Sequence, residues 1–182
     1  MGIKNESMRF VGFMLSLVII FIVLFLSGLL LPSKVTISKS VLINATSTEV
    51  KREVLEFDHW KNWYPAFKNE NVSIKDNPAS VKVIHSVSLK DNKGKELRLD
   101  LIKSKADTIE IHLESASSTK VNYQFIITHH GDGQTQLTWN VNTFMPWYPW
   151  EKIKGIFLDK VSGPQYEEAL IKLKKSVENK SE

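Results

Sequence analysis

One long uncharged stretch constrains this chain more than any other part of its sequence. The segment FVGFMLSLVIIFIVLFLSGLLL, from Phe10 to Leu31, has 22 residues and contains no Asp, Glu, Lys or Arg. Because an α-helix rises about 1.5 Å per residue, a helix of this length spans the roughly 30 Å hydrocarbon core of a bilayer. We therefore expect a single-pass membrane protein with an N-terminal tail (residues 1–9) and a transmembrane helix (residues 10–31).

Two other interpretations of this segment are a cleaved signal peptide and a buried core helix. The apolar part of a signal peptide is shorter, about 7–15 residues, and ends at a small-x-small cleavage site. Here the run ends in Leu29–Pro32 without such a site. A core helix normally keeps one polar side, whereas this run is apolar on every side. The sequence therefore favours an uncleaved anchor in a lipid bilayer.

The charges beside the span say little about which side of the membrane the rest of the chain occupies. Lys4 and Arg9 precede the span and Lys34 and Lys39 follow it, so the positive-inside comparison is almost balanced. Long domains translocate largely regardless of charge. We expect a cytoplasmic N-terminus and an extracytoplasmic domain.

The residues after the span have the size and composition of one folded domain. Residues 33–178 are enough for a sizeable hydrophobic core, and residues 179–182 form a short tail. The formal net charge of the chain is +4, with both signs interspersed and no basic cluster, so nucleic-acid binding is not expected. The sequence contains no phosphate-binding glycine loop, dinucleotide fingerprint or Gly-x-Ser-x-Gly elbow.

Alternation of apolar and polar residues predicts a sheet of about seven strands. The segment from Val35 to Asn44 predicts the first strand, and a helix from about Ser47 to Phe57 follows it. In the later strands the residues that share the apolar face are Val81, Val83, His85, Val87, Leu89, Leu97, Leu99, Leu101, Ile109, Ile111, Leu113, Val121, Tyr123, Phe125, Ile127, Leu137, Trp139 and Val141. Such strands are typical of an antiparallel sheet that is covered on one side.

The C-terminal segment predicts the helix that covers this sheet. Pro149 and Pro164 each suit the first turn of a helix. After Pro164, apolar residues recur at helical spacing, namely Tyr166, Ala169, Leu170, Leu173 and Val177. We therefore expect an α+β fold in which a curved antiparallel sheet wraps round a long C-terminal helix, leaving room for a ligand between them.

Three short motifs carry a resemblance to a known superfamily. They are Ile43-Asn44-Ala45, Trp60-x-x-Trp63-x-Pro65 and Gly163-Pro164-x-Tyr166-Glu167-x-x-Leu170-x-x-Leu173-Lys174. With them the chain resembles the START-like/Bet v 1-like superfamily, in particular its polyketide cyclase/dehydrase-type (SRPBCC) members. The resemblance implies a helix-grip fold, and an N-terminal membrane span occurs in some bacterial members. It implies no single activity, because the superfamily includes lipid carriers, hormone receptors, cyclases and co-chaperone-like domains.

The expected site lies between the apolar face of the sheet and the C-terminal helix. A hydrophobic small molecule or lipid would be held there by burial of its apolar surface and by one or two polar tethers. The expected ligand-binding residues are His85, Leu99, Ile111, Tyr123, Phe125 and Trp139, with Tyr166 and Leu170 from the helix. We expect no cofactor and no metal, since the sequence has no cysteine and no histidine pair at ligand spacing. A protein partner cannot be named from the sequence.

An enzymatic alternative rests on His85. Among apolar neighbours this histidine could act as the general acid/base of a cyclase- or hydrolase-like enzyme, or could tether a ligand headgroup. A histidine satisfied by a neighbouring backbone or hydroxyl group is the structural alternative. We favour ligand binding without catalysis.

Two further aromatic groups are candidates for the entrance of the site or for the membrane interface. Their members are Trp60, Trp63, Trp147, Tyr148 and Trp150. Tryptophan and tyrosine are favoured where apolar and polar surroundings meet, which includes the surface of a bilayer. The alternative is that aromatic side chains close the cavity by packing. The domain would then be a ligand-free interaction module at the membrane surface.

Overall fold

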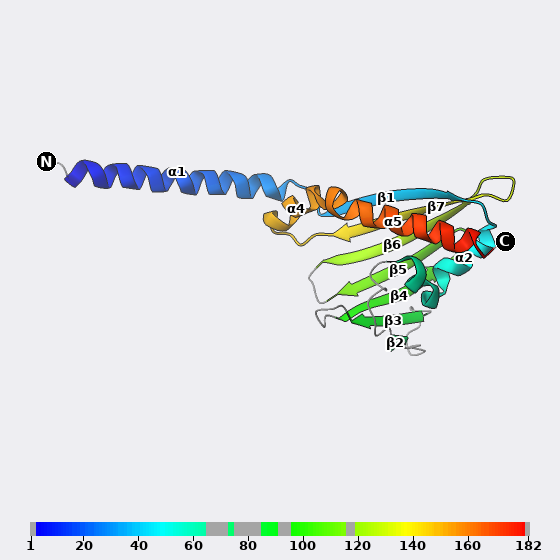
Figure 1. Ribbon diagram of the computed structural model, residues 1–182. Coiled ribbons are helices and arrows are strands. Elements are labelled where there is room, and N and C mark those ends of the chain that lie inside the picture. The colour runs from blue at the N-terminus through cyan, green and yellow to red at the C-terminus, as the bar shows by residue number, and fades with distance from the viewer. Residues whose placement is uncertain (1–2, 65–72, 75–84, 91–95, 116–118, 181–182) are drawn as a thin grey trace.

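The computed structural model describes residues 3–64, 73–74, 85–90, 96–115 and 119–180. A long N-terminal helix projects from a domain in which a curved sheet lies against one long helix (Figure 1). The helices are α1 (Ile3–Leu29), α2 (Ser47–Leu55), α3 (Trp60–Trp63), α4 (Pro149–Ile156) and α5 (Leu158–Glu178), with a 3-10 turn at Phe57–His59. The strands are β1 (Lys34–Ile43), β2 (Ser73–Ile74), β3 (His85–Lys90), β4 (Glu96–Ser104), β5 (Thr108–Ser115), β6 (Lys120–His129) and β7 (Thr135–Phe144).

The strands form one antiparallel sheet in the order β1-β7-β6-β5-β4-β3-β2. From β2 to β7 neighbours in the sheet are also neighbours in sequence, the usual result of short connections. β1 joins the far edge by pairing with β7, with Ile37 opposite Val141. β2 has only two residues, so the other six strands make up most of the sheet. The α+β fold with an antiparallel sheet and a long C-terminal helix is confirmed.

Alternation along the strands separates an inner face from an outer face. In β7 every second residue from Thr135 to Thr143 is buried, and the residues between them are only partly buried. Phe125 lies opposite Trp139, so inward side chains from neighbouring strands form continuous rows. The residues of α5 that are buried toward this face include Tyr166, Ala169, Leu170, Leu173 and Val177. The predicted apolar faces of sheet and helix therefore meet in one core.

Thr46 caps the first turn of α2. The hydroxyl of Thr46 accepts a hydrogen bond from the main-chain N–H of Glu49, and the Glu49 carboxylate accepts one from the N–H of Thr46. This reciprocal arrangement is a capping box, which satisfies two N–H groups at the start of the helix. The helix ends at Leu55, slightly before the predicted end at Phe57, and a 3-10 turn follows.

A buried carboxylate joins α2 to the C-terminal end of the chain. Glu53 is 2% exposed, and its oxygens accept hydrogen bonds from the Ser176 hydroxyl and the Lys180 ammonium, each at 2.9 Å. His59 lies 3.0 Å from the same carboxylate. A buried charge of this kind is tolerated only when it is paired and hydrogen-bonded. Lys180, which the sequence assigns to the tail, is thus part of the domain's packing.

α5 begins earlier than predicted. The sequence predicts a start at Pro164, but the helix already begins at Leu158 and contains Pro164 in its interior. The turn before the proline is helical, since the N–H of Val161 donates to the main-chain oxygen of Phe157 at 3.0 Å. The proline removes one backbone hydrogen bond, but packing against the sheet on both sides of it keeps the helix together. Pro149 does occupy the first turn of α4, as predicted.

α1 is the long apolar helix expected from the sequence, with different ends. It begins at Ile3 rather than Phe10 and ends at Leu29 rather than Leu31. Apart from its C-terminal end, the described side chains of this helix are largely exposed. Among the described residues it is the one helix long and apolar enough to cross a membrane, and a signal sequence near the N-terminus would have the same properties.

The C-terminal end of α1 packs directly on α4. A Cβ atom added at Gly28 would lie 2.3 Å from the Cβ of Pro149, so the approach requires glycine. Lys152 is 7% exposed, and its Nζ donates to the main-chain oxygen of Leu29 at 3.1 Å. This cation satisfies a terminal carbonyl and stabilises the negative end of the helix dipole. These contacts link α1 to the domain.

Replacing Gly28 by valine is expected to separate α1 from α4 and to lower the free energy of unfolding by about 1–3 kcal/mol, the usual cost of overpacking. Gly12→Val is the control, because a Cβ at that position of the same helix meets no atom within 4 Å. Thermal unfolding of both full-length variants in detergent micelles measures the difference. Identical unfolding transitions would contradict the close contact.

Candidate functional site

Aromatic rings fill much of the space between the sheet and α5, and we call this group the aromatic cluster. Its members are Trp60, Trp63, Tyr64, Tyr123, Phe125, Trp139 and Tyr166. Centroids of neighbouring rings lie between 4.7 and 6.5 Å apart, mostly in edge-to-face arrangements. Such contacts stabilise a core beyond the burial of area alone. Trp139 lies at the centre, stacked on Phe125 and edge-on to Tyr123 and Tyr166.

Three tyrosine hydroxyls meet inside the aromatic cluster. The hydroxyl oxygens of Tyr64 and Tyr123 are 2.8 Å apart, and Tyr123 also hydrogen-bonds with Tyr166. Burial is the main cause that raises the pKa of each of these tyrosines, because a phenolate loses its hydration in the interior. The hydroxyls therefore stay protonated at neutral pH and form a neutral polar group in apolar surroundings.

Two indole N–H groups of the aromatic cluster have no hydrogen-bond partner among the described residues. They belong to Trp63 and Trp139, which are 1% and 0% exposed. Trp60 differs, since its Nε1 donates to the main-chain oxygen of Val54 at 2.9 Å. A buried donor without an acceptor costs about 1–3 kcal/mol. An oxygen atom of a ligand or of an ordered water would therefore bind favourably at either indole.

The ligand-binding residues predicted from the sequence, where the structure describes them, come together in this core. They are Leu99, Ile111, Tyr123, Phe125, Trp139, Tyr166 and Leu170, and each is at most 8% exposed. Trp60 and Trp63 lie in the same core, because α3 directs both rings toward Phe125 at centroid distances of 6.0 and 6.5 Å. Burial therefore excludes a position in the bilayer interface for these two tryptophans.

The side chain of His85 lies outside the described part of the structure. Its backbone begins β3 and pairs with Leu101 of β4, which in turn lies opposite Ile111 of β5. This register places His85 at an inner-face position, in agreement with the alternation of the sequence. Among the residues whose side chains are described, no group of three or more His, Cys, Asp or Glu could hold a metal ion.

The second predicted aromatic group occupies an exposed position at the start of α4. Trp147 and Trp150 are 67% and 55% exposed, and Tyr148 stacks on Trp150 with a centroid distance of 5.1 Å. These residues follow β7 and adjoin Pro149, the residue on which Gly28 of α1 packs. Unlike Trp60 and Trp63, they remain available for an entrance or a membrane contact.

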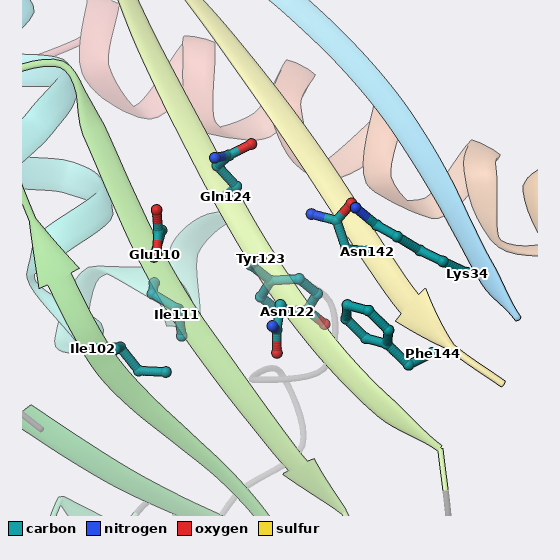
Figure 2. Close-up of a pocket in the computed structure, with 9 residues that line it drawn as sticks. All are labelled: Lys34, Ile102, Glu110, Ile111, Asn122, Tyr123, Gln124, Asn142 and Phe144. Atoms are coloured by element: carbon teal, nitrogen blue, oxygen red, sulfur yellow. The ribbon is translucent and has the colours of Figure 1, made fainter. Parts of the chain in front are cut away.

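A separate groove of about 220 Å³ lies on the outer side of the sheet, opposite to the aromatic cluster (Figure 2). It is lined by Lys34, Ile102, Glu110, Ile111, Asn122, Tyr123, Gln124, Asn142 and Phe144. Two of its amide side chains bond to residues beside the groove: the side-chain oxygen of Asn142 accepts from the Thr36 hydroxyl at 2.9 Å, and that of Gln124 accepts from the Asn140 amide at 3.2 Å. Nothing in the sequence indicates this groove, because alternation marks its polar positions, such as Glu110, Asn122 and Gln124, only as solvent-facing and no motif links them.

Comparison with known proteins agrees with this architecture. Residues 34–178 match the family described as polyketide cyclase / dehydrase and lipid transport. No curated protein matches the sequence. The aromatase/cyclase Zhui from Streptomyces sp. R1128 is 12% identical, with a TM-score of 0.64 over 82% of this chain and 96% of that one.

Two other solved structures share the fold at similarly low identity. A START superfamily protein from Mycobacterium smegmatis is 18% identical, with a TM-score of 0.60 over 80% of this chain and 98% of that one. The protein of unknown function SA2116 from Staphylococcus aureus is 15% identical, with a TM-score of 0.64 over 81% and 96%. Because the family match extends over most of the chain, the protein belongs to the polyketide cyclase/dehydrase and lipid transport family and has its START-like (SRPBCC) fold.

Proposed function

We propose that the domain binds a hydrophobic small molecule or lipid between the inner face of the sheet and α5, and that α1 anchors it in a membrane. The observation that carries the proposal is the pair of indole N–H donors, of Trp63 and Trp139, buried without described acceptors in the aromatic cluster. A ligand with an apolar body and an acceptor oxygen would bury its apolar surface and satisfy these donors. The family's description, which includes lipid transport, supports this ligand class.

The contacts at the end of α1 support a retained anchor over a removed signal sequence. Without α1, the Nζ of Lys152 would lose the Leu29 oxygen, and Pro149 would lose the helix that covers it. The domain without α1 would therefore lack this hydrogen bond and would expose the apolar surface at Pro149. With α1 retained, the 20 residues Phe10–Leu29 are long enough to cross the bilayer. The extracytoplasmic side of the domain stays a prediction from the sequence.

We expect Trp63→Phe and Trp139→Phe to weaken ligand retention roughly fivefold each, because each change keeps a ring but removes one hydrogen-bond donor worth about 1 kcal/mol. The full chain is purified in detergent and analysed by native mass spectrometry, and retained molecules are then extracted with organic solvent and identified. The wild type should carry a defined lipid or apolar metabolite in near-stoichiometric amount.

Trp150→Phe is the matched control for this measurement, since Trp150 is 55% exposed and outside the aromatic cluster. Lipids that bind only to α1 should be retained equally by all variants. Full retention in both core variants would contradict the assignment of the site. A folded wild type that carries only the lipids common to every variant would contradict ligand storage in the interior.

A cyclase- or hydrolase-like enzyme that uses His85 is the second candidate. It is favoured by the strand register, which puts His85 at an inner-face position opposite Leu101. An enzyme holds its substrate only briefly. A well-folded protein that retains no ligand on purification would therefore favour this candidate. A ligand-free interaction module would also retain no ligand. It differs from the enzyme in that it would convert no substrate.

A further inference from the structure

We propose that α4 and the start of α5 form a second membrane contact, lying in the interface of the bilayer that α1 crosses. This inference rests on the proposed anchoring by α1. The contact consists of six exposed apolar residues, which we call the α4 surface: Trp147, Trp150, Ile153, Ile156, Phe157 and Val161. Their exposed fractions range from 46% to 76%.

The exposed side of α4 carries large apolar residues, and its buried side contains a lysine, which is the opposite of a helix that faces water. Pro149, Lys152 and Gly155, spaced by three residues, form the buried side. Trp150 and Ile153 are 55% and 46% exposed on the other side. A helix at an aqueous surface buries its apolar side and exposes its charged side. The exposed side of α4 is therefore suited to surroundings less polar than water.

Exposed apolar residues continue past the end of α4 into the first turn of α5. Phe157 stands between α4 and α5 and is 56% exposed, and Val161, whose N–H donates to the main-chain oxygen of Phe157, is 76% exposed one turn further on. Residues three and four apart lie on the same side of a helix. Contiguous exposed apolar surfaces of this kind mark sites of protein or membrane interaction rather than ordinary solvated surface.

The position of the α4 surface favours a bilayer as its occupant. Gly28, at the C-terminal end of α1, packs on Pro149 of α4, and Lys152 holds the carbonyl of Leu29. If α1 crosses the bilayer, this end of it lies near the lipid headgroups, and α4 must lie at the same depth. Figure 1 shows α4 and the start of α5 beside α1, whereas α2 and the C-terminus lie at the far end of the domain.

The composition of the α4 surface agrees with an interfacial position. Trp147 and Trp150 are of the residue type enriched at the level of the headgroups. Lys160, exposed within the same segment, has a long stem that can extend toward lipid phosphates, whereas the ammonium of Lys154 pairs with the Glu151 carboxylate. A bilayer contact of this kind would hold the domain in one orientation, with the α4 end of its core against the lipid.

The absence of cysteine from the chain allows a direct test with single spin labels. Ile153→Cys places the label on the α4 surface, and Ile171→Cys on α5 is the matched control. The two isoleucines are 46% and 47% exposed, so they differ in location rather than in burial. Each full-length variant is reconstituted into phosphatidylcholine vesicles that contain a minority of phosphatidylglycerol, and the vesicles are collected by flotation. Accessibility of each label to oxygen and to a water-soluble nickel chelate is then measured.

We expect a severalfold higher ratio of oxygen to nickel accessibility at position 153 than at position 171. A water-like ratio at both positions in protein that floats with the vesicles would overturn the inference while leaving the anchor intact. A label at position 153 that is shielded from both reagents would also overturn it, since a protein partner would then cover the surface. Failure of the intact chain to float would overturn the proposed anchoring and, with it, this inference.

Discussion

Replacing Trp139 by alanine is expected to lower the free energy of unfolding by about 3–5 kcal/mol, as for other buried aromatic side chains. Trp139 is 0% exposed, and its ring packs against Phe125, Tyr123 and Tyr166. The cavity left by the ring lies between the sheet and α5, and neither element can move inward without breaking its other contacts. Urea denaturation of the full chain in micelles, followed by circular dichroism, measures the change.

Trp150→Ala is the control for this experiment, because it removes the same side chain from a position that is 55% exposed. We expect its effect on the free energy of unfolding to stay within about 0.5 kcal/mol. Equal losses in the two variants would contradict the placement of Trp139 at the centre of the core.

Above about pH 10 the free energy of unfolding should fall steeply with pH, because three buried tyrosines keep their protons in the folded state. Burial is the main cause that raises the pKa of Tyr64, Tyr123 and Tyr166 above the value in the unfolded chain. Below the unfolded-state pKa both states are protonated, and the full stability is present. Above it, the unfolded chain releases protons that the folded chain retains, so rising pH favours unfolding. Each tyrosine adds a slope of about 1.4 kcal/mol per pH unit.

Urea denaturation at increasing alkaline pH measures this slope in the wild type and in Tyr64→Phe. The variant lacks one of the three buried hydroxyls, so its slope should be smaller by about 1.4 kcal/mol per pH unit. Tyrosinate absorbance should rise together with unfolding rather than before it. Equal slopes in the two proteins would show that the Tyr64 hydroxyl ionises as freely in the folded state as in the unfolded chain.

Local patterns were sufficient to predict most of the secondary structure. The alternation in β7 and Pro149 at the start of α4 each involve residues close in sequence. The start of α5 at Leu158 could not be predicted in this way. Packing of the helix against the sheet outweighs the local preference of proline for a first turn.

The candidate site was predicted in part. Tyr123 and Trp139 were predicted on the inner face from alternation alone, and the structure brings them together with Tyr166 of α5. Alternation carries no information about Trp60 and Trp63, which stand in a short helix outside the sheet. Their burial depends on where α3 lies against β6 and α5. That the indole N–H of Trp63 has no described acceptor follows from the same tertiary contacts and could not be predicted from the sequence.

By itself the sequence determined the length of the apolar segment, the face of each described strand that turns inward and the family to which the chain belongs. These properties depend on composition and on spacings of two to four residues. Only the tertiary structure decided which tryptophans are buried, and that Lys152 holds the Leu29 carbonyl across 123 positions of sequence. The physical reason is that burial and polar satisfaction are set by contacts between distant segments, which no local pattern encodes.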